Sequence, residues 1–312
     1  GGAGLSGLGM AAPVLIFPGQ ATEAVGMSSP WPENPIWSAV MAAAERHSGY
    51  ALRTWMAAGP LEVLKEQRHA PVAVLSHSVA LFSAQRAAGM PLPCVASGHS
   101  MGFFSAVVAA GVVPLEACLD LFRAVEDEAE VRFGKGTMGM AFVIGLKEGE
   151  VRAALAGLNH AFLSNVNGSA QMTVSGAHAD LVTFVARVEP HALKAGLLPV
   201  QLPLHAEPMA PLLPYIASRL SGWQPRDPAF PLISPLDGRV IESGFEAWEE
   251  TQVSLASAIR WPAVVAGLKG FSGPWLECGF GAQLSNLSRW VDRELKVESL
   301  QEVRVWREAL GE

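Results

Sequence analysis

The sequence predicts an α/β protein with two subdomains: a large hydrolase-like one built on a mostly parallel sheet flanked by helices, and a small ferredoxin-like (split β-α-β) one inserted in it. Two observations support this prediction. Short apolar stretches with strand character alternate with stretches of helical spacing, which is typical of a parallel sheet covered by helices. Around Gly136 this changes to the order strand, helix, two strands, helix and strand, which indicates the inserted unit.

The alternating part begins with the buried strand "PVLIFPGQ", which Pro-Gly closes. Pro114 suits the first turn of a later helix, because the first amides of a helix have no internal partner. The elements are predicted at residues 13–20 (strand), 35–57 and 70–88 (helical spacing), 92–98 (strand), up to about 110 (helix) and 114–132 (helix).

The inserted part is predicted at residues 137–146 (strand), 147–158 (helix), 161–176 (two strands with a turn), 178–190 (helix) and 197–203 (strand). Beyond it lie "WPAVVAGL", "PWLECGFG" and a charged C-terminal helix. We therefore expect a large subdomain of residues 10–136 and 199–312 and a small one of residues 137–198. Residues 1–9, "GGAGLSGLG", are interpreted as a cloning remnant.

The composition excludes several classes of protein. Half of the 312 residues are hydrophobic and 16% are charged, which is typical of a chain with a large core. The net charge of −7 disfavours nucleic acid as a partner. Because Cys94, Cys118 and Cys278 lie far apart, we expect no metal site and a reducing, cytoplasmic location. No apolar run reaches the roughly 18 residues of a membrane span.

The stretch "GHSMG" at residues 98–102 matches the G-x-S-x-G pattern of a nucleophile elbow. In such an elbow the serine occupies a strained turn between a strand and a helix, and glycines avoid clashes with the neighbouring backbone. The pattern predicts Ser100 as a nucleophile and the backbone amide of Met101 as an oxyanion donor. The alternative, a serine in an ordinary loop, needs the glycines to be coincidental.

A serine nucleophile needs a base, and the chain has eight histidines. His205 follows a predicted strand and precedes a helix, where a loop side chain can overhang a cleft. His99 is expected to point away from the elbow. The other histidines lie on helices or in polar segments: His47, His69, His77, His160, His178 and His191. The pattern alone favours His205 without excluding a structural role.

Five motifs follow one another in an order that resembles the malonyl-CoA:acyl-carrier-protein transacylases and the wider acyltransferase family of fatty-acid and polyketide synthesis. They are "FPGQ", "GHSMG", "NVNGSAQMTVSG", "PLHAEPM", and "AIRW" with "WLECGFGAQLSNL". The resemblance covers nearly all of residues 10–303. It implies ping-pong acyl transfer between thioesters, with no tightly bound cofactor and no metal; a phosphopantetheine thioester of coenzyme A or of a carrier protein is the substrate.

The resemblance also implies roles for individual residues. Ser100 matches the nucleophile that becomes acylated, and His205 the general base and acid. Gln20 and the Met101 amide match the oxyanion hole. Asn167 matches a pocket-side asparagine, and a backbone carbonyl near Ser254 is expected to orient the histidine.

One departure from the family concerns the acyl group. Malonyl-type members carry an arginine that binds the malonate carboxylate, and Val125 stands at that position here. Arg123 lies two residues away, on the opposite helix face, and is a poor substitute. Together with Phe103 and Leu204, Val125 predicts an apolar acyl pocket and a non-malonyl acyl group. Most of the acidic residues that follow, Glu126, Asp127, Glu128 and Glu130, are interpreted as a solvated face.

Basic residues near the C-terminus and on the first inserted helix predict a docking rim for an acidic acyl carrier protein. They are Arg152, Arg289, Arg293 and Arg304, with Lys147, Lys296 and Arg307. The carrier protein and acyl-CoA are the expected partners, nucleic acid and membrane are not, and the chain is expected to be a monomer. Scattered surface charge remains the alternative for each basic residue.

The sequence therefore favours a discrete acyltransferase, with polyketide or related biosynthesis as the expected setting. Three alternatives stay open: an acyl hydrolase acting on carrier-bound acyl groups, a malonyl-CoA:acyl-carrier-protein transacylase, and a catalytically silent docking partner. An ordinary α/β-hydrolase is the rival at the level of the fold. That fold needs an acidic residue between the serine and the histidine in the sequence, and Asp180 or Glu189 would serve.

Overall fold

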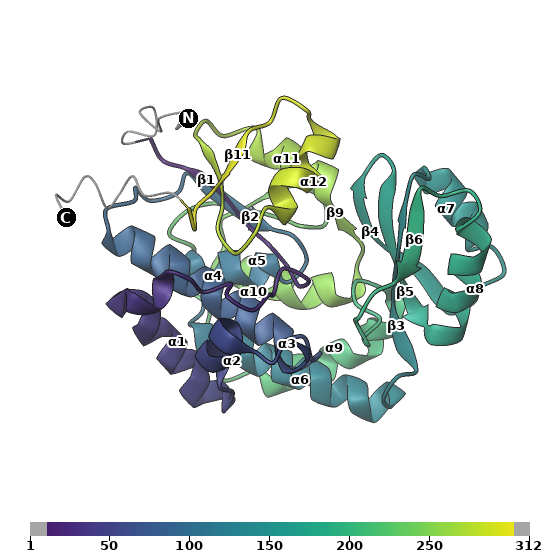
Figure 1. Ribbon diagram of the computed structural model, residues 1–312, viewed down its shortest axis with the longest axis horizontal. Helices are drawn as coiled ribbons and strands as arrows, with labels where there is room; N and C mark the ends of the chain where they lie inside the picture. Colours follow the sequence, from purple (N-terminus) through teal and green to yellow (C-terminus); the bar gives the residue numbers. More distant parts are fainter. Residues whose placement is uncertain (1–10, 303–312) are drawn as a thin grey trace.

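The large subdomain of the computed structural model, which describes residues 11–302, is built on a six-stranded sheet (Figure 1). The strand order is β11-β10-β1-β2-β7-β8, and every neighbouring pair whose register is known is parallel except β7 and β8. The strands are β1 Val14–Phe17, β2 Val95–Gly98, β7 Leu232–Ile233, β8 Val240–Ile241, β10 Trp275–Glu277 and β11 Val297–Ser299. The prediction of a mostly parallel sheet is confirmed.

Helices cover both faces of this sheet, because alternate side chains of each strand point to opposite faces. Val14 and Ile16 of β1 pack in one core with α11 (Trp261–Leu268) and α12 (Gln283–Val291). Leu15 and Phe17 face the larger core. The helices of that core are α1 Pro35–Ser48, α2 Leu52–Ala58, α3 Leu61–Leu64, α4 Ala70–Ala87, α5 Gly102–Ala109, α6 Leu115–Phe133, α9 Leu213–Arg219 and α10 Gly244–Val253.

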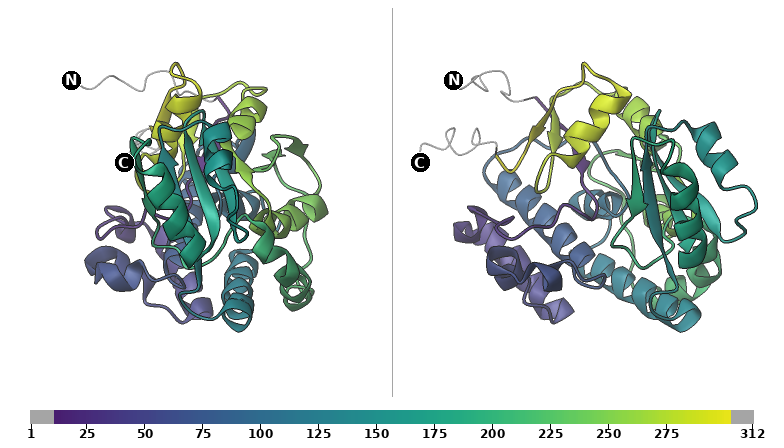
Figure 2. Two further views of the ribbon diagram at one scale, coloured as in Figure 1. Left: turned by 90° about the vertical axis from the view of Figure 1, so that its right-hand side faces the viewer. Right: turned by 45° about the vertical axis from the view of Figure 1, so that its right-hand side comes forward.

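The small subdomain has the predicted order of elements. They are β3 Met138–Ile144, α7 Glu148–Ala154, β4 Ala161–Gly168, β5 Gln171–Ala177, α8 His178–Val188 and β6 Lys194–Leu197. The two helices lie on the face of the sheet that is turned away from the large subdomain (Figures 1 and 2). The strand order is β6-β3-β5-β4-β9. The fifth strand, β9 (Ile259–Arg260), lies outside the predicted insert and pairs in parallel with β4. It ties the two subdomains together.

Three sequence expectations need correction or refinement. The last strand of the insert is β6, Lys194–Leu197, rather than residues 197–203, because Pro199 and Pro203 have no amide for a ladder. The helical stretch 35–57 is two helices, since Gly49 adopts a left-handed φ of 79° and ends α1. The charged stretch after α12 includes the parallel edge strand β11, which periodicity did not reveal.

The most buried long helix is α4, in which 15 of the 18 residues are buried. Such a pattern is typical of a helix in the interior of a large core. Among residues 11–302, none of the helices has the length and hydropathy that crossing a bilayer requires. Short 3-10 helices complete the fold at Trp31–Glu33, Glu207–Leu212 and Ser254–Ala256.

Candidate active site

Ser100 lies in the tight turn between the carboxyl end of β2 and the start of α5. Its φ is 56°, in the left-handed region that side-chain-bearing residues rarely adopt. A Cβ added at Gly98 would lie 2.0 Å from the carbonyl carbon of Gly102, and one at Gly102 would lie 2.0 Å from the carbonyl oxygen of Phe17. Only glycine fits at either position. The backbone packing therefore accounts for the G-x-S-x-G pattern.

The side chains of Ser100 and His205 form a hydrogen-bonded dyad. Ser100 Oγ lies 2.6 Å from His205 Nε2, and His205 Nδ1 lies 2.6 Å from the carbonyl oxygen of Ser254. A carbonyl can only accept, so Nδ1 carries the proton and Nε2 is free to accept one from Ser100. The amide of His205 also donates to the carbonyl of Leu255. The predicted carbonyl contact to the histidine is present.

The imidazole of His205 is 2% exposed, and burial lowers its pKa to about 4. The hydrogen bond to Ser254 opposes this shift of the pKa, and the neighbouring His99 adds to it. At neutral pH the ring is therefore uncharged and able to accept the hydroxyl proton of Ser100. This is the protonation state that a general base requires.

The two predicted oxyanion donors lie beside the dyad. Met101 is the N-terminal cap residue of α5, so its amide has no carbonyl partner in a preceding helical turn. Gln20 follows β1 and lines the same cavity as Ser100 and His205. A carbonyl oxygen placed here would receive hydrogen bonds as negative charge develops on it.

A narrow cavity of about 30 Å³, which we call the inner cavity, opens beside Ser100. Most of its lining is apolar, with Val125 and Leu204 at the predicted positions. The full lining is Gln20, Gln67, Pro71, Ser100, Met101, Phe104, Phe122, Val125, Glu126, Leu202, Leu204, His205 and Leu255. Among the described residues that form it, none is a lysine or an arginine. Arg123 is exposed and its guanidinium donates to the His47 carbonyl, away from this cavity.

Phe103 does not line the inner cavity, and that prediction is wrong. Its side chain is fully buried in the core, and Phe104 takes the expected place. The reason is helical spacing: Met101 and Phe104 are three residues apart and share a face of α5, whereas Phe103 points elsewhere.

Asn167 also departs from the expected pocket-side position. Its Oδ1 accepts a hydrogen bond of 2.7 Å from His99 Nε2, and the ring of His99 meets Trp261 edge to face. His99 does point away from the elbow, as predicted, and burial lowers its pKa. Asn167 therefore connects β4 of the small subdomain to the back of the elbow and does not line the inner cavity.

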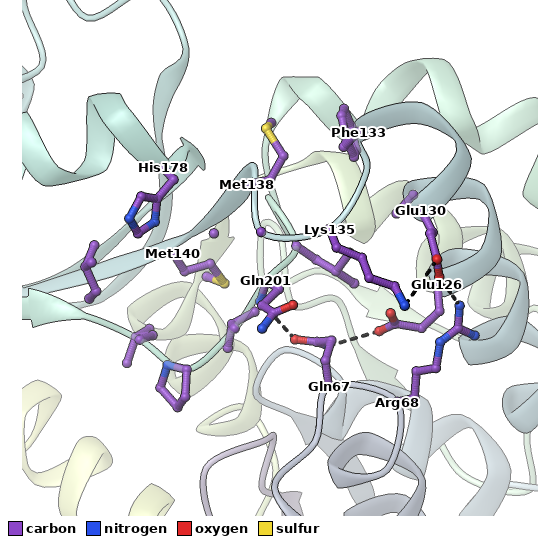
Figure 3. Close-up of a pocket in the computed structure, with 18 of the residues that line it drawn as sticks. Gln67, Arg68, Glu126, Glu130, Phe133, Lys135, Met138, Met140, His178 and Gln201 are labelled. Carbon is purple, nitrogen blue, oxygen red and sulfur yellow. Dashed lines mark hydrogen bonds and ion pairs between the residues drawn. The ribbon is translucent and has the colours of Figure 1, made fainter.

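Sequence reasoning missed two polar residues of the inner cavity, Gln67 and Glu126. Gln67 Nε2 donates to Glu126 Oε1 at 3.0 Å, and the two side chains point toward one another in Figure 3. Burial raises the pKa of Glu126 to about 7. Helical spacing could have revealed Glu126, which follows Phe122 by four residues and Val125 by one. Gln67 lies in a connecting segment after α3 without such a signal.

The three acidic residues that follow Glu126 on α6 form ion pairs on the surface, in line with the solvated face expected there. Asp127 pairs with Arg68 at 3.0 Å and with Arg219 at 2.8 Å. Glu128 pairs with Arg219, and Glu130 with Arg68 and Lys135. Glu126 is the exception, because its side chain turns toward the inner cavity.

The acids nominated for an α/β-hydrolase triad lie elsewhere. Asp180 accepts a hydrogen bond from the amide of His160 within the small subdomain, and Glu189 ends α8 at the surface. The Nδ1 atom of His205 is occupied by the Ser254 carbonyl. The geometry is therefore that of a serine–histidine dyad with a backbone carbonyl as its third member.

The basic residues expected to dock a carrier protein are exposed where the structure describes them. Arg152 pairs with Glu148 at 2.7 Å, and Arg289 and Arg293 lie on and just after α12. Arg304 and Arg307 lie outside the described residues. Among residues 11–302, no three histidine, cysteine or acidic side chains gather in a group that could hold a metal ion.

Comparison with protein families finds that the acyl transferase domain matches residues 14–256. The chain is 27% identical over 294 residues to the malonyl CoA-acyl carrier protein transacylase of Salmonella typhimurium, covering 92% of this chain and 95% of that protein. It is 28% identical over 305 residues to the protein of the same name from Haemophilus influenzae, covering 93% and 95%.

Comparison with solved structures agrees with the comparison of sequences. The acyl-carrier-protein S-malonyltransferase of Burkholderia pseudomallei superposes with a TM-score of 0.87 and 26% identity, covering 96% of this chain and all of the other. A malonyl-CoA:acyl carrier protein transacylase from Xanthomonas oryzae also gives 0.87 and 26%, covering 96% and 98%. The resemblance read from the motifs thus extends over the whole fold.

Proposed function

Because this chain belongs to the acyl transferase domain family and is an acyltransferase, we propose that it moves an acyl group onto an acyl carrier protein through an acyl-Ser100 intermediate. The observation that carries the proposal is the dyad: a nucleophile 2.6 Å from a neutral, buried and oriented histidine. The named relatives act on acyl carrier protein, which supports the same partner here.

The proposed reaction has two halves. Ser100 Oγ attacks the thioester carbonyl carbon while His205 Nε2 takes the hydroxyl proton, and the Met101 amide with Gln20 stabilises the oxyanion. The C–S bond then breaks, and the thiol of coenzyme A or of a carrier protein leaves with the proton from His205. In the second half the phosphopantetheine thiol of the acceptor attacks the ester carbon, and Ser100 regains its proton.

The comparisons support malonyl as the acyl group better than the non-malonyl group that we expected. The relatives described above are named as malonyl transferring enzymes, and they match this chain over nearly its full length. Malonyl transfer was an alternative in the sequence analysis, and it is the first candidate for this enzyme.

A second candidate, a group without a free carboxylate, is favoured by one specific observation. Val125 stands where the resemblance places a carboxylate-binding arginine, and Glu126 beside it brings a carboxyl group to the inner cavity. A malonate carboxylate would be desolvated there without a cationic partner among the lining residues and would be repelled by an ionised Glu126.

Mass spectrometry of the intact protein after mixing with malonyl-CoA, acetyl-CoA and longer acyl-CoA tests both candidates. The expected adduct maps to Ser100 and disappears when holo carrier protein is added. Ser100→Ala should lose the adduct completely, whereas Ser83→Ala, on the half-buried side of α4, should keep it. An adduct on another residue would contradict the mechanism.

The same measurement separates transfer from hydrolysis. An adduct that decays in buffer with release of free acid would identify an acyl hydrolase that clears carrier proteins.

A role for Arg152, Arg289 and Arg293 in docking the carrier protein is part of this proposal, as is a setting in polyketide biosynthesis. Salt should weaken such docking, because exposed charges are screened.

A further inference from the structure

A second and much larger cavity, of about 570 Å³, lies between α6 and the small subdomain. We call it the outer cavity. Its walls include the end of α6, the start of β3 and the segment of residues 197–202 (Figure 3). At about 30 Å³ the inner cavity holds little more than one or two water-sized groups, since one water needs roughly 10–15 Å³. An acyl group longer than a few atoms cannot fit in the inner cavity alone.

The two cavities share part of their lining. Gln67, Glu126 and Leu202 line both. Gln67 Oε1 accepts a hydrogen bond from the amide of Gln201 at 3.1 Å while its Nε2 donates to Glu126. This pair of hydrogen bonds holds Gln67 at the junction, with the apolar side chain of Leu202 beside it. These three residues therefore form the common wall of the inner cavity at Ser100 and the outer cavity.

The outer cavity suits a neutral, mainly apolar chain. Its charged lining residues are three cations, Lys65, Arg68 and Lys135, and three carboxylates, Glu66, Glu126 and Glu130. Because positive and negative side chains are equal in number in this lining, a charged end of the acyl chain would gain no net electrostatic stabilisation there. The apolar lining includes Phe133, Met138, Met140, Leu181 and Leu197.

We propose that the two cavities together bind one extended neutral acyl group, with its thioester carbonyl at Ser100 and its distal part past Leu202 in the outer cavity. The proposal rests on the proposed function, and within it on the second candidate for the acyl group. Glu126 and Gln67 at the junction exclude a short acid and let a long chain pass beside Leu202.

The test compares acyl-CoA probes from acetyl to dodecanoyl, with the rate of Ser100 acylation read by intact mass. If methylenes are buried in the transition state, each adds about fourfold to the rate while room remains. Gln201 is exposed and lines only the outer cavity, so Gln201→Trp would fill the space beside Gln67. We expect this variant to lower the ratio of dodecanoyl to acetyl rates more than about tenfold, the loss of two or more buried methylenes.

Gln224→Trp is the matched control, since Gln224 is exposed and lines neither cavity. It should leave the ratio unchanged. Leu197→Trp, at a residue 42% exposed in the outer cavity, repeats the test if Gln201→Trp fails to fold. An unchanged ratio in a folded outer-cavity variant would overturn the proposal. So would acylation by malonyl or acetyl alone, which would leave the proposed function intact; no adduct with any probe would refute the proposed function itself.

Discussion

The elbow around Ser100 and the cavity-facing side of α6 both border the inner cavity, yet different forces specify them. At the elbow the backbone decides: two glycines fit where any Cβ would clash, and Ser100 has a left-handed φ. On α6 the side chains decide, with Val125 and Glu126 on an ordinary helix. A substitution on α6 can therefore alter the acyl group without disturbing the dyad. We therefore expect the chemistry and the specificity of this enzyme to be separable by mutation.

The largest expected effect is at the dyad. His205→Gln removes the base that accepts the Ser100 proton, and acylation should slow by roughly 10²- to 10⁴-fold. The measurement is the rate of adduct formation with the preferred acyl-CoA. His160→Gln, at an exposed histidine of the small subdomain, should acylate at the original rate. A fully active His205→Gln protein would show that another group takes the proton.

A smaller effect tests the claim that backbone packing specifies the elbow. Gly102→Ala places a Cβ 2.0 Å from the Phe17 carbonyl oxygen, so the free energy of unfolding should fall by about 3 kcal/mol or more. Gly149→Ala is the control, because Gly149 lies in α7 with open space around it. That change should be neutral or stabilise the protein by up to about 1 kcal/mol. Equal results for both variants in denaturant unfolding would refute the packing argument.

The smallest effect concerns Glu126 and depends on pH. Burial raises the pKa of its carboxyl group from 4.5 to about 7, so between these values the folded state holds a proton that the unfolded chain has released. The stability that this group contributes is therefore full below pH 4.5 and is lost as pH rises through 7. Glu126→Gln abolishes this loss, and its stability relative to the unmodified protein should rise across that range by up to about 3 kcal/mol.

Denaturant unfolding at several pH values measures this difference. Glu66→Gln, at a carboxylate whose side chain is 57% exposed, serves as the control and should show no comparable rise. If the difference in the free energy of unfolding between Glu126→Gln and the unmodified protein does not change with pH, the carboxyl group is ionised and solvated in the folded protein. The argument that a malonate carboxylate is desolvated at this position would then lose its basis.

The order of the elements could be predicted because each is encoded locally. Strand-like runs, helical spacing and the glycines of the elbow identified β1, β2, α5, α6 and the elements of the insert apart from its last strand. Several strands that depend on distant partners were missed or misplaced. β9 is only two residues long and pairs with β4, β6 pairs with β3, and β11 pairs with β10. No local pattern distinguishes such short segments from loops.

The candidate site shows the same difference between features encoded by neighbouring residues and features that depend on distant ones. The structure brings together Ser100, predicted from its motif, and His205, predicted with help from the family resemblance. Phe103 was wrongly placed, because the sequence shows that Phe103 and Phe104 lie on a helix but not which one faces the cavity. Asn167 was expected in the pocket, and its partner His99 could not be seen without the fold.

By itself the sequence determined the class of protein, the predicted nucleophile and its strained turn, since these follow from neighbouring residues and from the conformations that glycine alone permits. Only the tertiary structure decided what surrounds the acyl group. Gln67, Glu126 and Leu202 come from three separate segments and meet at one junction because the helices and the small subdomain pack as they do. Burial, which raises the pKa of Glu126 and lowers that of His205, is a property of that packing.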